Sequence, residues 1–63
     1  MKLYVPIPSC FKFKRMFDEN EYLQEVLEED RDSISLWYIN EECDMAELRR
    51  ILTDGRINYR IKE

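Results

Sequence analysis

The sequence of 63 residues contains no histidine, one glycine and two cysteines, and each shortage excludes a kind of chemistry. Histidine is the commonest general base near neutral pH and the usual partner of serine and cysteine nucleophiles, so the familiar catalytic pairs are missing. A single glycine excludes the glycine-rich loops that hold phosphates or dinucleotides. A standard zinc site needs four ligands, mostly thiolate or imidazole, which this chain does not have. We therefore expect no enzyme, no metal and no cofactor.

The two cysteines, Cys10 and Cys43, lie far apart in the sequence and form no CxxC pair. Small secreted domains usually carry several disulfides, and the N-terminus shows no signal peptide. No apolar run approaches the ~18 residues that a membrane span needs. We therefore expect a soluble, cytoplasmic protein without membrane contact, in which both thiols are reduced and mostly buried.

The length allows one domain, residues 1–63, whose core is small. Chains of this size often depend on a partner subunit or on a dense aromatic core. The sequence has four tyrosines, three phenylalanines and one tryptophan, which bury large apolar areas. Trp37 either belongs to that core or anchors an interface. In the second case a homodimer would supply the missing burial.

The N-terminal part alternates between short β-type runs and a proline-rich bend. Residues 2–5 are typical of a strand, and the two prolines in residues 6–9 indicate a bend or an edge irregularity. Residues 11–14, Phe-Lys-Phe-Lys, alternate apolar and basic side chains with the period of a half-exposed strand. They either continue the first strand or form a second one.

A first helix is predicted from about residue 19 to residue 30. Asp18 with Glu21 resembles a capping box. The apolar positions that follow have helical spacing: Tyr22, Leu23, Val26 and Leu27.

The second half of the chain predicts a strand, a helix and a final strand. Residues 33–39 are β-branched and aromatic. A helix follows from Asp44, with Glu47 as its capping partner, and Gly55 is expected to end it in a left-handed conformation. Residues 56–62 alternate strictly, with Ile57, Tyr59 and Ile61 facing inward.

The predicted order is therefore β(β)αβαβ, an α+β fold. Two helices should pack on one face of a three- or four-stranded sheet. The connections are long enough for parallel neighbours, and the strand order stays open.

Charge is strongly segregated along the chain. Residues 1–16 carry four bases and no acid, residues 17–47 carry twelve acids and one base, and residues 48–63 carry five bases and two acids. The formal net charge of −4 therefore conceals an acidic middle between two basic ends. Such segregation affects association more than folding.

On the predicted helix the acids Asp18, Glu21, Glu25, Glu28 and Glu29 form one stripe at i, i+3 and i+4 spacing. No lysine interrupts this stripe. The predicted partner-binding residues are Glu21, Glu25, Glu28, Glu29, Asp32, Glu41, Glu42 and Trp37. The leading hypothesis is a small acidic inhibitor or adaptor that binds a basic, nucleic-acid-handling protein. Compact acidic proteins of this kind often come from phages or mobile elements, which is an analogy of class only.

Two other functions stay open. A regulator, dimeric in form, would bind nucleic acid through bases on the first and last strands: Lys12, Lys14, Arg15, Arg56, Arg60 and Lys62. The negative net charge makes nucleic acid the less favoured partner. Alternatively, the chain is a subunit that folds or works only inside a larger assembly.

Overall fold

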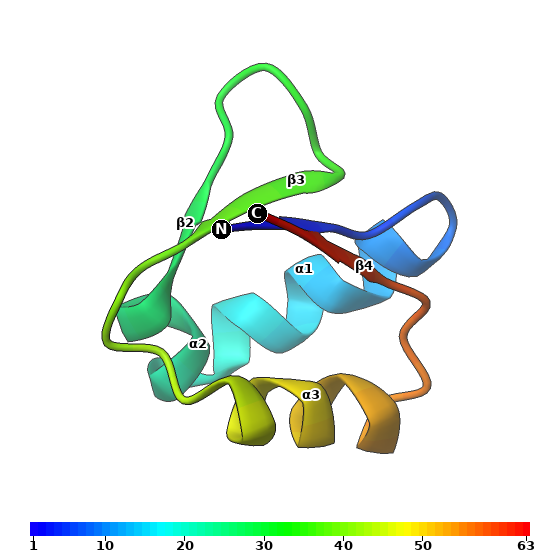
Figure 1. Ribbon diagram of the computed structural model, residues 1–63. Coiled ribbons are helices and arrows are strands. Elements are labelled where there is room, and N and C mark those ends of the chain that lie inside the picture. Colours follow the sequence, from blue (N-terminus) through cyan, green and yellow to red (C-terminus); the bar gives the residue numbers. More distant parts are fainter.

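Three helices cover one face of a four-stranded antiparallel sheet in the computed structural model, which describes residues 1–63 (Figure 1). The elements in chain order are β1 (Lys2–Tyr4), α1 (Ser9–Glu19), α2 (Glu21–Val26), β2 (Leu27–Glu29), β3 (Leu36–Ile39), α3 (Met45–Asp54) and β4 (Arg60–Lys62). The strand order is β2-β3-β1-β4. The α+β class and the helices on one face are confirmed, but there are three helices where two were expected.

Alternation in the strands separates a buried face from an open face. Leu3 on β1 is paired with Trp37 on β3 and with Ile61 on β4, and these side chains point toward the helices. Trp37 is only 1% exposed and its ring lies against Phe13 and Phe17 of α1, with centroids 4.9 and 4.7 Å away. Trp37 therefore belongs to the core and is not a surface anchor.

The prediction of a strand over residues 11–14 is wrong, because these residues lie in α1. Four alternating residues also fit a helix when the wider pattern is included. Cys10, Phe13 and Phe17 are spaced by three and four residues, and all three pack into the core. Phe11, which a strand would have turned inward with Phe13, is 58% exposed.

The single helix predicted over residues 19–30 is divided. α1 ends at Glu19, and Asn20 begins α2 by accepting a hydrogen bond from the backbone N–H of Leu23 at 3.1 Å. Asp18 therefore does not cap a helix. After Val26 the chain extends into β2, where Leu27 pairs with Ile39 and Glu29 with Trp37. Pairing with β3, about ten residues further along, outweighs the local helical pattern.

The helix predicted after Asp44 is confirmed as α3. The Asp44 carboxylate accepts hydrogen bonds from the N–H groups of Ala46 and Glu47, at 3.0 and 3.3 Å. Its C-terminal turn differs from expectation. Gly55 is right-handed, with φ of −81°, and the left-handed residue is Arg56, with φ of 55°. Glycine at position 55 instead permits close packing, since a Cβ there would lie 2.9 Å from the end of the Met16 side chain.

The remaining strands are shorter than predicted. β3 begins at Leu36, so residues 33–35 belong to the loop before it, and β4 begins at Arg60. The predicted inward set at the C-terminal end is confirmed, since Ile57 is buried while Tyr59 and Ile61 are half-buried. Every strand pair is antiparallel, although the connections were long enough for parallel neighbours. None of the helices combines the length and apolar character needed to cross a membrane.

Candidate functional site

Two of the predicted acids are neutralised by one lysine. Lys14 on α1 forms salt bridges with Asp18, one helical turn later, and with Glu29 on β2, at 3.1 and 2.5 Å. The hydrogen bonds to Glu29 and then to Asp18 raise the pKa of Lys14. Glu29 pairs across from Trp37, so it points toward the helix layer and away from the open face. Asp18 and Glu29 are therefore poor candidates for binding a partner.

The other two salt bridges lie within α3, where Arg50 binds Glu47 and Asp54. The remaining predicted acids form no salt bridge and are all exposed: Glu21, Glu25, Glu28, Asp32, Glu41 and Glu42. Unpaired exposed carboxylates keep their full charge available to an approaching cation.

The fold brings two groups of these acids together. Glu21 and Glu25 lie one turn apart on α2, and Glu28 follows on β2. Asn40, which directly follows β3, donates from its side-chain amide to the carbonyl of Glu25 at 2.7 Å, and from its backbone N–H to the carbonyl of Val26 at 3.0 Å. The next two residues in the turn are further acids. We call Glu21, Glu25, Glu28, Glu41 and Glu42 the acidic surface.

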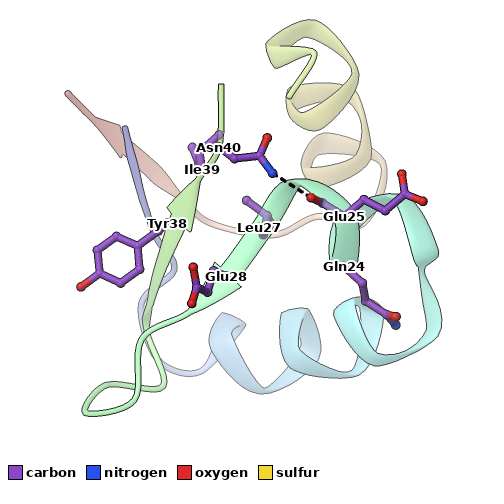
Figure 2. Close-up of a pocket in the computed structure, with 7 residues that line it drawn as sticks. All are labelled: Gln24, Glu25, Leu27, Glu28, Tyr38, Ile39 and Asn40. Carbon is purple, nitrogen blue, oxygen red and sulfur yellow. Dashed lines mark hydrogen bonds between the residues drawn. The ribbon is translucent and has the colours of Figure 1, made fainter. Parts of the chain in front are cut away.

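A groove of about 490 Å³ runs along this junction (Figure 2). Its lining residues come from the end of α2, from β2 and from the end of β3: Gln24, Glu25, Leu27, Glu28, Tyr38, Ile39 and Asn40. Figure 2 shows the Glu28 carboxylate on the same side as Tyr38, whereas the Glu25 carboxylate extends away from the strands. The carboxylates thus spread along a surface, and they do not converge on one point.

Asp32 is separate from the acidic surface. It lies in the β2–β3 loop, which meets the end of β3 opposite to Asn40. Nearby, the Tyr38 hydroxyl donates to Asp30 at 2.7 Å. This hydrogen bond raises the pKa of Tyr38, and the charges of Asp32 and Glu28 add to the effect. It lowers the pKa of Asp30. The end of the sheet beside the β2–β3 loop is therefore also negatively charged.

Sequence reasoning missed Gln24 and Asn40 as parts of this site. Asn40 carries no local signal, because its partner Glu25 lies 15 residues away. Gln24 donates to the carbonyls of Phe17 and Asp18, at 2.9 and 3.0 Å, and so fixes α2 against the end of α1. These amides position the acids and need not touch a partner.

The bases named for nucleic-acid binding do not form one surface. Lys12, Lys14 and Arg15 lie on α1, in the helix layer. Arg60 and Lys62 lie on β4, where their register with Tyr4 and Lys2 places them on the open face of the sheet. These two groups therefore lie in different layers of the fold, although β1 and β4 are neighbours, as that hypothesis required.

The thiols and carboxylates are the remaining side chains that could act on a ligand. No three of these side chains are grouped so that they could hold an ion. Cys10 is buried and Cys43 half-buried, and neither is in a disulfide. Burial raises the pKa of Cys43, which disfavours the reactive thiolate. Comparison with known protein families, curated proteins and solved structures finds no match, so the site rests on its own geometry.

Proposed function

We propose that this protein is a small inhibitor or adaptor that binds a basic surface of another protein through the acidic surface. The observation that carries the proposal is the set of five exposed carboxylates, from α2, β2 and the β3–α3 turn, that have no salt-bridge partner. Glu21 and Glu25 are one helical turn apart, a spacing at which like charges are destabilising, and a cationic partner would relieve this repulsion.

The partner class that this surface fits best is a protein whose basic groove normally holds nucleic acid. Phosphates repeat densely along nucleic acids, and a row of carboxylates offers a comparable series of negative charges. The surface extends over three elements, so it suits an extended groove better than a pocket for one cationic side chain. The Glu25 and Glu28 carboxylates extend in different directions, which also suits a long groove better than a pocket for one side chain (Figure 2).

Affinity capture from a cell lysate at low salt tests the proposal. The two baits are the wild-type chain and a variant with Glu21→Lys and Glu25→Lys. We expect a basic protein that the wild-type bait retains and the variant bait does not. Nuclease treatment should not release this protein. Retention of nucleic acid by both baits would contradict the proposal and would move the function to the bases of β4.

A further inference from the structure

The face of the sheet opposite the helices carries an ordered pattern of charge. Two rows of side chains cross it from β2, through β3 and β1, to β4. The first row is Glu28, Tyr38, Lys2 and Lys62, and the second is Asp30, Leu36, Tyr4 and Arg60. Each row begins with an acid and ends with a base. The face is therefore negative along β2 and positive along β4, with aromatic and aliphatic side chains between.

The bases of this face have no salt bridge within the chain, although the Lys2 ammonium lies 5.9 Å from the centroid of the Tyr38 ring. Lys2 is directly opposite Lys62, and like charges so placed destabilise a sheet. Neither lysine forms a salt bridge, and neither does Arg60. Tyr4 and Tyr38 at the centre remain 39% and 38% exposed. Exposed tyrosines beside bases that have no salt bridge are typical of a surface that meets a partner.

We propose that the open face binds a second copy of this chain, in a symmetric dimer whose two-fold axis runs parallel to the strands between β3 and β1. Rotation about this axis places β4 of one protomer over β2 of its partner and keeps the rows in register. Glu28 then faces Lys62 of the partner, and Asp30 faces Arg60. A two-fold axis across the strands would instead place acids on acids, so charge selects the first arrangement.

The balance of charge on the face favours a second copy over nucleic acid. An anionic strand would be attracted by β4 but repelled by Glu28 and Asp30 along β2. The self-complementary face satisfies both sides at once. Its area is small, since four short strands about 4.8 Å apart cover roughly 200–250 Å². Stable interfaces bury about 800 Å² per partner, so the dimer should be weak and sensitive to salt.

Sedimentation velocity at low salt, over a concentration series up to about 1 mM, tests this dimer. We expect wild type to dimerise and the single variants Glu28→Lys and Lys62→Glu each to associate at least ~10-fold more weakly. The double variant should dimerise again. An equimolar mixture of the two single variants should form a heterodimer, because each supplies the charge that the other has lost.

Loss of folding would not imitate these results. Lys62→Glu places a carboxylate opposite Lys2, so its thermal midpoint should not fall. A wild type that stays monomeric throughout, or a dimer that survives either single reversal, would overturn the proposal. Binding of a single-stranded oligonucleotide by the monomer, lost in Lys62→Glu, would assign the face to nucleic acid and also overturn it. Glu28 belongs to both the acidic surface and this face, but Glu21 and Glu25 lie outside the face. The capture experiment changes only Glu21 and Glu25, so its outcome is distinguishable from that of the dimer test.

Discussion

Replacing Trp37 by alanine should remove roughly half or more of the free energy of unfolding. Truncation of a buried tryptophan or phenylalanine costs about 3–5 kcal/mol. A domain of this length is expected to have a free energy of unfolding of roughly 3–9 kcal/mol, at about 0.05–0.15 kcal/mol per residue. Trp37 joins β3 to α1 through Phe13 and Phe17, so its loss would remove the aromatic contact between these two elements.

Trp37→Phe is the matched control and should cost less than half as much. It keeps an aromatic ring against α1 and removes the indole N–H, which is buried and has no hydrogen-bond acceptor. An unsatisfied buried donor costs about 1–3 kcal/mol, so its removal offsets part of the lost volume. Urea denaturation followed by circular dichroism measures both variants. Equal losses for alanine and phenylalanine would show that ring packing is not what Trp37 contributes.

The second large effect concerns binding. Glu21→Lys with Glu25→Lys should weaken the affinity for the captured partner by roughly 100-fold, because like charges brought together across an interface cost several kcal/mol. Both side chains are exposed on α2, so the fold should survive. Titration calorimetry at fixed ionic strength measures the change.

The control for this variant is Asp54→Lys with Glu63→Lys, which changes the net charge by the same amount. Asp54 lies on α3 and Glu63 follows β4, and neither belongs to the acidic surface. The control breaks one exposed salt bridge, between Asp54 and Arg50, which is worth about 0–1 kcal/mol. We expect it to bind within about threefold of wild type. An equal loss in both variants would mean that net charge, and not a defined surface, drives binding.

The parts of the fold that were predictable are those with local signals. Asp44 caps α3 as its sequence context indicates, and the apolar stripe containing Leu48 and Leu52 is buried. The alternation in the C-terminal strand correctly identifies Ile57 and Ile61 as inward. In each case the side-chain period and the cap agree, so local and tertiary preferences coincide.

The errors arose where long-range contacts decide the structure. Residues 27–29 continue a helical pattern from α2, but they pair with β3 and become an edge strand. Phe11 and Phe13 look like one face of a strand, yet only Phe13 reaches the core, because Trp37 provides its contact. Neither the β2–β3 pairing nor the Phe13–Trp37 contact can be recognised from the residues that neighbour them in the sequence.

The candidate site was predictable in composition but not in geometry. The single acidic stripe becomes carboxylates on two helices and a strand, and Lys14 removes two of them by salt bridges. The hydrogen bond from Asn40 to the carbonyl of Glu25 also brings the next two residues, Glu41 and Glu42, close to the end of α2. A helical wheel cannot show either effect, because both depend on how the elements meet.

The most direct test of the central claim is an amide-shift map of the ¹⁵N-labelled chain during titration with its captured partner. We expect the largest shifts at residues 21–28 and 40–42, with little change on α3 or at residues 9–18. Shifts concentrated on α3 or β4, with residues 21–28 unaffected, would contradict the proposal that the acidic surface is the binding site.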